Sequence, residues 1–194
     1  GAPHLIKSVA SAIDDKLFKH VSGIVSSETV VAHIRNATHG EHSIINTHPF
    51  QHGAWVFAHN GNIKNFTEKR DILLDKIDPR LRRFILGNTD SEVFFYLILT
   101  HLDRRIELHR SDVCMNDVVK AIRMAIHEIG SIIGDFSSNN DGPHTDTYLT
   151  FILSNGRNII AHHGGKDLYY STYKSRCSER DTCPSFSKEC ESPT

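Results

Sequence analysis

The sequence lacks an excess of charge of either sign, and it lacks long hydrophobic runs. Its 194 residues include 22 lysines and arginines against 23 aspartates and glutamates, which gives a net charge of −1. Such a chain has no overall positive field to hold nucleic acid or an anionic membrane surface. Its longest apolar stretches fall well short of the ~20 residues that a transmembrane helix requires. We therefore expect neither nucleic acid nor a membrane as a partner.

The sequence also lacks an initiator methionine, and its first residues do not have the pattern of a secretory signal peptide. We therefore expect a processed, cloned or incomplete chain. Hydrophobic residues make up 39% of the sequence and charged residues 23%, a composition that can bury a core. The length fits one domain or slightly more.

Cysteine is scarce. Cys114 stands in the middle of the chain, whereas Cys177, Cys183 and Cys190 lie in its last 18 residues. No other feature indicates secretion, so we expect a reduced, cytoplasmic protein. The last three cysteines are spaced more widely than a CxxC zinc site, and we interpret residues 174–194 as a solvated excursion from the core. A structural metal or a disulfide is the alternative there. Cys114 is expected to be buried and unreactive.

Histidine, in contrast, is abundant, with 14 residues. Six of them lie in one third of the chain: His33, His39, His42, His48, His52 and His59. No pair has the HExxH spacing of a helical zinc site. We therefore expect no metal and no other cofactor. A metal-dependent hydrolase is an alternative that only the number of histidines favours.

The hydrophobic pattern predicts an α+β domain. Helical spacing of apolar residues extends over 14–25, 65–77, 116–130 and the run that follows 89–92. Short apolar runs predict strands at 29–34, 54–58, 147–153 and 158–162, with a further short strand at 168–170. Residues 36–53 and 137–146 are rich in turn-forming residues and are expected to be loops.

Local signals mark several element boundaries. Thr89, with Glu92 three residues later, forms a capping box in front of an apolar helical run. Asn155-Gly156 between two apolar strands predicts a hairpin turn. Asn60-Gly61, directly after the predicted strand 54–58, favours a backbone with positive φ.

Three polar groups stand at the ends of predicted elements, where side chains meet ligands. Arg35 follows the strand 29–34 and can grip a carboxylate through two parallel hydrogen bonds, or form an ordinary surface ion pair. Asn60 and Gly61 offer an amide and an unshielded N–H, which suit an oxyanion hole or a plain turn. Asp90 can receive an ammonium group or simply complement the dipole of its helix.

These groups lie in three of four linked motifs, which are HIRNATHG (33–40), NTHPF (46–50), WVFAHNGNI (55–63) and GNTDSE (87–92). Together the motifs closely resemble the glutaminase domain of class II glutamine amidotransferases, in the N-terminal-nucleophile hydrolase superfamily. The single-domain bacterial branch, with γ-glutamyl hydrolases of ergothioneine synthesis and glutathione breakdown, is most similar. The resemblance implies a four-layer αββα sandwich, incomplete here. It also implies a glutaminase-like domain over 1–173, with 174–194 as the cysteine-containing excursion.

The resemblance assigns a role to each candidate residue. It implies that Arg35 grips the α-carboxylate of glutamine or a γ-glutamyl compound, with Thr38 and His39 lining the same end. Asp90 receives the α-ammonium group, and the pair Asn60 and Gly61 holds the oxyanion that forms at the side-chain carbonyl. One cation and one anion at a fixed separation would select a zwitterion. Trp55 and Phe57 are expected in the core.

The sequence departs from the family at its start. The family's nucleophile is a cysteine at the mature N-terminus, whereas residue 1 here is glycine and the nucleophile strand is missing. We therefore expect an amidohydrolase whose nucleophilic cysteine is not present in this chain. The alternatives are a non-catalytic glutamine-binding module, or one part of a site that another polypeptide completes. A homo-oligomer or a partner subunit is compatible with both.

Overall fold

The computed structural model describes residues 3–25, 27–34, 43–143, 145–171 and 180–182. At its centre lies a four-stranded antiparallel sheet in the order β1-β2-β3-β4. The strands are β1 (Phe50–His52), β2 (Trp55–Asn62), β3 (Tyr148–Ser154) and β4 (Ile159–His162). Because β2 and β3 pair over seven residues, they form the rigid middle of the sheet.

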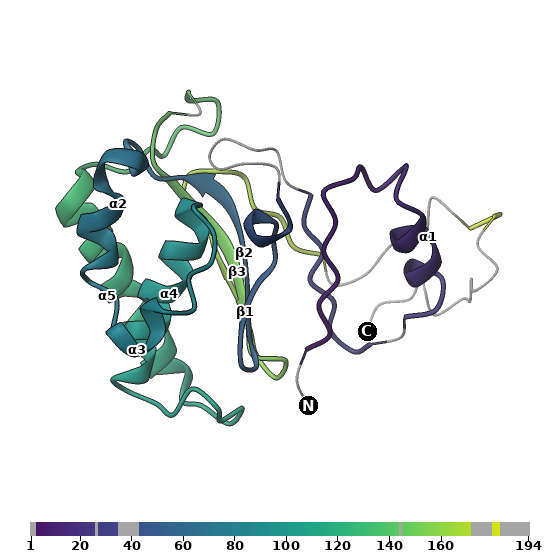
Figure 1. The fold of residues 1–194 in the computed structure, drawn as a ribbon, viewed down its shortest axis with the longest axis horizontal. Coiled ribbons are helices and arrows are strands. Elements are labelled where there is room, and N and C mark those ends of the chain that lie inside the picture. Colours follow the sequence, from purple (N-terminus) through teal and green to yellow (C-terminus); the bar gives the residue numbers. More distant parts are fainter. Residues whose placement is uncertain (1–2, 26, 35–42, 144, 172–179, 183–194) are drawn as a thin grey trace.

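Four helices lie together on one face of this sheet (Figure 1). They are α2 (Phe66–Leu74), α3 (Pro79–Arg82), α4 (Asp90–Asp103) and α5 (Met115–Ile133). The residues of α4 are buried from Asp90 to Leu102, since this helix packs between the sheet and its neighbouring helices. The predicted mixture of helices with an antiparallel sheet is confirmed, as are the two longest predicted helices.

Aromatic side chains fill the layer between the sheet and α4. Phe57 of β2 stacks on Phe95 with ring centroids 5.4 Å apart and meets the edge of Phe94 at 5.6 Å. Trp55 is fully buried, and its Nε1–H donates to the carbonyl of Leu108 at 3.0 Å. The sequence-based placement of Trp55 and Phe57 in the core is therefore correct.

The start of α4 follows the predicted capping box only in part. The Thr89 hydroxyl accepts from the N–H of Glu92 at 3.3 Å, as an N-cap residue should. The Glu92 carboxylate does not return a bond to Thr89. It accepts instead from the N–H groups of Leu86 and Gly87, at 3.1 and 2.7 Å, and so ties the preceding loop to the helix.

The strand predicted over 29–34 is wrong. The described residues there have no strand structure, and Val30 and Ile34 are 69% and 88% exposed. Their apolar character predicted burial, but backbone pairing requires a neighbouring strand, which β-propensity does not specify. The short strand predicted at 168–170 does not form either.

Two further predictions need correction in the middle of the chain. Residues 36–53 are not entirely loop, because they contain a 3-10 turn (Ile44–Asn46) and strand β1, which is too short to show a period. Residues 35–42 lie outside the described residues. Asn60 and Gly61 lie inside β2 and not in a turn, and Gly61 is absent from the glycines with positive φ. The short helix α3 has no counterpart among the predicted elements.

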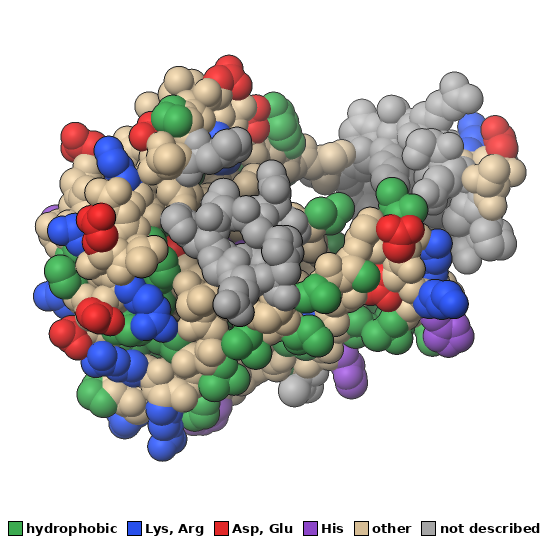
Figure 2. All heavy atoms as spheres, turned by 45° about the horizontal axis from the view of Figure 1, so that its top comes forward, with side chains coloured by type: hydrophobic (Ala, Val, Ile, Leu, Met, Phe, Trp, Pro, Cys, Tyr) green, Lys and Arg blue, Asp and Glu red, His purple; other side chains and the backbone are tan. Residues whose placement is uncertain are grey.

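The hairpin between β3 and β4 is confirmed, with Gly156 at φ +83° in its turn. A helix also forms within the predicted range 14–25, as α1 (Lys16–Ser22), but none of its residues is buried. Leu17 and Phe18 are 54% and 48% exposed. Figure 2 shows hydrophobic side chains at the surface around this helix.

The described residues form one sheet with α2, α3, α4 and α5 on one face, and they contain no second sheet. The predicted four-layer arrangement therefore goes beyond what these residues show. None of the helices in the described part of the chain is both long and apolar enough to cross a membrane.

Candidate active site

Three of the four sequence motifs meet where β2 ends and α4 begins. Asp90 at the start of α4 accepts a hydrogen bond from the N–H of Ile63, which follows β2, at 2.8 Å. Ser91 contacts the His59 ring, and Asn88 pairs with Asn46. The fold thus brings together residues that lie more than 40 positions apart in the sequence.

The backbone of Gly61 faces an edge of β2 that β1 leaves uncovered. Gly61 lies opposite Leu149, whose N–H donates away from β2, to the carbonyl of Gly164 at 2.9 Å. Gly61 and Leu149 are thus a non-hydrogen-bonded pair, in which the N–H and C=O groups of each residue point away from the partner strand. The N–H of Gly61 therefore points to the edge of β2 that faces away from β3. Strand β1 covers that edge only as far as Phe57. This N–H is therefore placed to donate to a ligand.

Gly61 also has no room for a side chain. A Cβ atom there would collide with the carbonyl oxygen of Tyr148 and with Nε2 of His59. Glycine is thus required by close packing and not by an unusual φ. Asn60, the neighbouring residue, has an exposed side chain on the opposite face of the strand from His59 and Gly61.

The carboxylate of Asp90 is held in a fixed orientation. One oxygen accepts from the N–H of Ile63, and the other accepts from the N–H of Ser91 at 2.7 Å and lies 3.2 Å from the Ser91 hydroxyl oxygen. The residue is only 3% exposed and stands in the first turn of α4, where the helix dipole favours negative charge. A cation that reached it would be largely desolvated, which strengthens the attraction.

His59 lies between Gly61 and Asp90 and is buried. Its Nε2 is 3.0 Å from the carbonyl oxygen of Tyr148, and its Nδ1 is 3.0 Å from the Ser91 hydroxyl. Burial lowers the pKa of His59 below 6.5, although the nearby Asp90 charge acts in the opposite direction. The ring is therefore neutral at physiological pH.

A pair of asparagines braces the loop before α4. The amide nitrogen of Asn46 donates to the side chain of Asn88 at 2.8 Å, and the N–H of Asn88 donates back at 3.0 Å. A Cβ on Gly87 would collide with Asn46, so this contact also requires glycine. The motif containing Asn46 thereby fixes the motif that contains Asp90.

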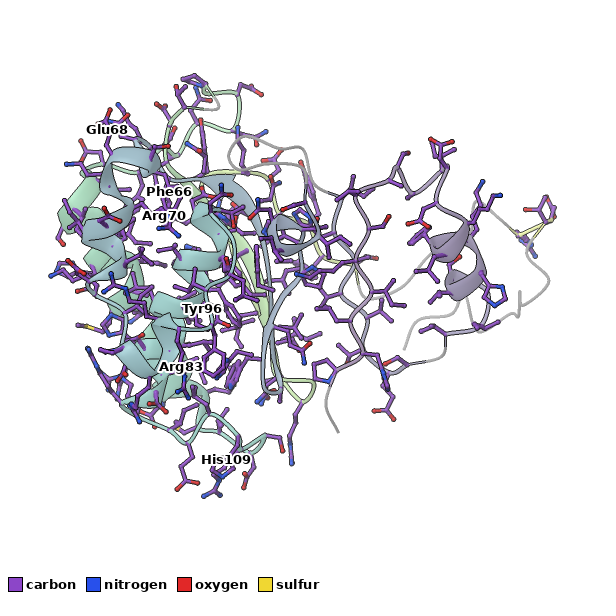
Figure 3. The ribbon with its side chains drawn as sticks, in the orientation of Figure 1. Phe66, Glu68, Arg70, Arg83, Tyr96 and His109 are labelled. Carbon is purple, nitrogen blue, oxygen red and sulfur yellow. The ribbon has the colours of Figure 1, made fainter. Side chains whose placement is uncertain are left out.

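A hollow of about 270 Å³ lies beside β1, lined by apolar side chains together with Lys7, Glu92 and Tyr96. Burial lowers the pKa of Lys7 and raises that of Glu92, and each charge partly offsets the effect on the other. Burial and the Glu92 charge raise the pKa of Tyr96 to about 12. Figure 3 labels Tyr96 on α4. All three groups are thus poorly solvated.

The structure describes three of the six predicted site residues. It brings Gly61 and Asp90 together through His59 and Ser91, whereas the side chain of Asn60 lies on the opposite face of β2. The other three, Arg35, Thr38 and His39, lie outside the described residues. His33, just before them, is described: its Nε2 is 3.1 Å from the carbonyl oxygen of His59, on the edge that Gly61 faces.

Sequence reasoning assigned no role to Ser91, although it directly follows Asp90. Its hydroxyl contacts both Asp90 and His59. A buried serine between an acid and a histidine has no distinct sequence pattern, since the histidine lies 32 residues away. The one available signal was that Ser91 and His59 both lie in the motifs that carry the family resemblance.

Cys114 is exposed, which contradicts the expectation that it is buried. It is the N-cap residue of α5, but its side chain makes no capping hydrogen bond. The loop 104–114, which precedes α5, packs against Trp55 and Asn155, at the opposite end of the sheet from Gly61. In Figure 3, His109 marks that end and Phe66 the site end. Trp55 and Gly61 are six positions apart along β2, which corresponds to roughly 20 Å. Cys114, at the Trp55 end, is therefore too far from Gly61 to act in this site.

Comparisons with known proteins agree on one family. The family model of class-II glutamine amidotransferases matches residues 5–177. A probable glutamine amidotransferase of Saccharomyces cerevisiae, DUG3, is 32% identical over 162 residues, which is 81% of this chain and 45% of the relative. A putative glutamine amidotransferase of Haemophilus influenzae is 33% identical over 71% of this chain and 40% of its own length. The chain therefore spans less than half the length of these relatives.

A solved structure has the same fold. It is a glutamine aminotransferase class-II domain protein from Silicibacter pomeroyi, with 25% sequence identity and a TM-score of 0.61. The match covers 82% of this chain and 60% of the solved one. Within the described residues, no three histidine, cysteine, aspartate or glutamate side chains are grouped so that they could hold a metal ion.

Proposed function

Because this chain belongs to the class-II glutamine amidotransferases, we propose that it binds glutamine or a γ-glutamyl compound for cleavage of the side-chain amide. One observation carries the proposal. The N–H of Gly61 faces the edge of β2 beyond the end of β1, while the Asp90 carboxylate accepts from the N–H of Ile63, at the same strand end, at 2.8 Å. A donor for an oxyanion and an acceptor for an ammonium group are thus held on one rigid unit.

The proposed reaction is acyl transfer through a thioester. A cysteine thiolate attacks the amide carbon, and the carbonyl electrons move to oxygen, where Asn60 and the N–H of Gly61 donate to the oxyanion. Collapse of this intermediate expels ammonia or an amine, which takes up a proton, and water then hydrolyses the thioester to the carboxylate. In this proposal the thiol belongs to an N-terminal cysteine, as in the family that the motifs resemble, because Cys114 lies at the far end of the sheet from Gly61.

The proposal assigns substrate selection to two charges. Asp90 receives the α-ammonium group, and Arg35 binds the α-carboxylate, with Thr38 and His39 beside it. The position of His33 supports this assignment, since it contacts the carbonyl of His59 only two residues before Arg35. A substrate that lacks either charge leaves a partner unpaired and is rejected.

We also propose that the complete fold is a four-layer sandwich, in which a second sheet packs on the face opposite the helices. The side chains on this face support such packing. Val56 and Ala58 of β2 are small and apolar, and Ile159 of β4 is 58% exposed there. A sheet face with these apolar side chains suits packing against another sheet.

Glutamine binding and turnover test the proposed function. Titration calorimetry of the complete natural protein with L-glutamine should show binding, and Asp90→Asn and Asn60→Ala should each weaken binding or turnover by at least tenfold. Release of glutamate establishes hydrolysis, whereas binding without release indicates the non-catalytic binding module. A protein that neither binds glutamine nor releases glutamate, with an N-terminal cysteine intact, would exclude the proposal.

A further inference from the structure

The hydrogen bonds around His59 define which ring nitrogen carries the proton. Nε2 is 3.0 Å from the carbonyl oxygen of Tyr148, which can only accept. Nε2 must therefore carry a hydrogen. In a neutral ring Nδ1 is then an acceptor, and the group opposite it is the Ser91 hydroxyl at 3.0 Å.

The Ser91 hydroxyl has one hydrogen but two acceptors. One acceptor is Nδ1 of His59 at 3.0 Å, and the other is a carboxylate oxygen of Asp90 at 3.2 Å. A neutral His59 requires the hydrogen to point to the ring. A doubly protonated His59 would itself donate from Nδ1, and the hydroxyl hydrogen would then turn to Asp90. The protonation state of His59 thus decides whether the Asp90 carboxylate accepts a hydrogen bond from the Ser91 hydroxyl.

We propose that His59 and Ser91 are positioning residues for Asp90. Nδ1 of neutral His59 accepts a hydrogen bond from the Ser91 hydroxyl, which leaves the Asp90 carboxylate free to receive the substrate ammonium group. This inference rests on the proposed role of Asp90 and adds two residues to it. Two backbone N–H groups, of Ile63 and Ser91, hold the carboxylate in place. Its remaining acceptor positions then face the ammonium group instead of a protein hydroxyl.

The surroundings of His59 support a neutral ring. The rings of Phe57 and Phe94 flank it at centroid distances of 6.0 and 5.6 Å. Asp90 on α4 is the charged group that acts on it, and burial nevertheless keeps its pKa below 6.5. His33 contacts the backbone carbonyl of residue 59.

The same ring also supports the oxyanion donor. Its Nε2 occupies the space that a side chain on Gly61 would need, beside the carbonyl of Tyr148. A single buried imidazole therefore contacts the strand residue that holds the oxyanion and, through Ser91, the acid that holds the ammonium group. Its position couples the two ends of the proposed substrate.

Binding of two ligands that differ by one group tests the inference. L-glutamine and glutaramate, which is glutamine without its α-amino group, are titrated into the complete natural protein. At pH 7.5 Ser91→Ala should bind glutamine as the parent does, because neutral His59 already directs the hydroxyl hydrogen away from Asp90. At pH 5.5 it should bind glutamine roughly three- to tenfold more tightly than the parent, the range expected for removal of one competing hydrogen bond, and leave glutaramate binding unchanged. Ser91→Thr, which retains the hydroxyl, should behave as the parent at both pH values. Ser154→Ala, the same substitution at the far end of β3, should affect neither ligand.

The pH dependence provides a readout that a merely structural role would not change. Glutamine should bind more weakly at pH 5.5 than at pH 7.5, since protonation of His59 turns the Ser91 hydroxyl toward Asp90. This step should be smaller in Ser91→Ala and absent for glutaramate. A glutamine affinity that does not change between pH 5.5 and 7.5 in the parent, or one that changes equally in the parent and in Ser91→Ala, would overturn the inference.

Nitrogen-15 NMR of the His59 ring separates this inference from the proposed function. It needs no substrate, and it should show hydrogen on Nε2 and none on Nδ1 at pH 7.5. Hydrogen on Nδ1 instead would overturn the proposed hydrogen bond from Ser91 to His59, even if glutamine binds. If glutamine does not bind but the Nε2–H form is found, the proposed substrate is wrong while the arrangement of His59 and Ser91 stands.

Discussion

At the scale of single residues, the site depends on glycine where another residue would be expected to fit. Gly61→Ala would drive a Cβ into the Tyr148 carbonyl and the His59 ring, and paired strands cannot move apart easily. We expect a loss of about 1–3 kcal/mol in stability and at least a hundredfold loss of turnover. Thermal unfolding and glutamate release measure the two effects. Gly23→Ala is the matched control, since its Cβ would make only ordinary contacts, and equal effects of both substitutions would contradict the prediction.

The same residues show how far sequence reasoning extends. Asn60, Gly61 and Asp90 could be named from the sequence because each lies in a local motif with a clear chemical group, and their roles stay predictions. The reason for Gly61 could not, since an Asn-Gly pair predicts a turn with positive φ, whereas tertiary packing against Tyr148 and His59 requires the glycine within a strand. Ser91 was missed because its partner His59 is distant in the sequence.

At the scale of elements, the N-terminus of α4 carries the acid of the site. Thr89→Ala removes the hydroxyl that caps the helix at the N–H of Glu92 and should cost about 1 kcal/mol in stability. Because Asp90 is the first residue of this helix, glutamine affinity should fall as well. Denaturant unfolding and calorimetry measure the two changes.

Two control variants accompany this prediction. Thr89→Ser should behave as the parent, and Thr67→Ala, at an exposed position in α2, should change stability by less than about 0.5 kcal/mol. A Thr89→Ala variant with unchanged stability would refute the capping role.

Among the elements, sequence periodicity identified those that bury a continuous face. Helix α5 and the hairpin of β3 and β4 formed as predicted, because local spacing and turn residues agree with the tertiary fold. Strand β1 has only three residues, too few to show alternation. The apolar run 29–34 did not become a strand, since composition alone provides no pairing partner.

At the scale of the whole molecule, three partly or fully buried histidines make stability depend on pH. Burial lowers the pKa of His52, His59 and His162 below 6.5 in the folded state, whereas the unfolded chain takes up protons near 6.5. As the pH falls below 6.5, the unfolded state therefore binds more protons and stability decreases. Glu92 acts in the opposite sense, because its raised pKa stabilises the fold below 4.5 and the gain is lost as the pH rises.

We expect the midpoint of thermal unfolding to be lower at pH 5.5 than at pH 7.5, since three histidines outweigh one glutamate in this range. His162 offers the clearest test, because its ring stacks on Phe151 at 5.0 Å and phenylalanine can replace that contact. His162→Phe should reduce the difference in midpoint between the two pH values. His109→Phe, at a side chain that is 81% exposed, should leave the difference unchanged. A midpoint that does not vary between pH 5.5 and 7.5 would mean that these rings take up protons as readily in the folded chain as in the unfolded one, and would remove the physical basis for a neutral His59.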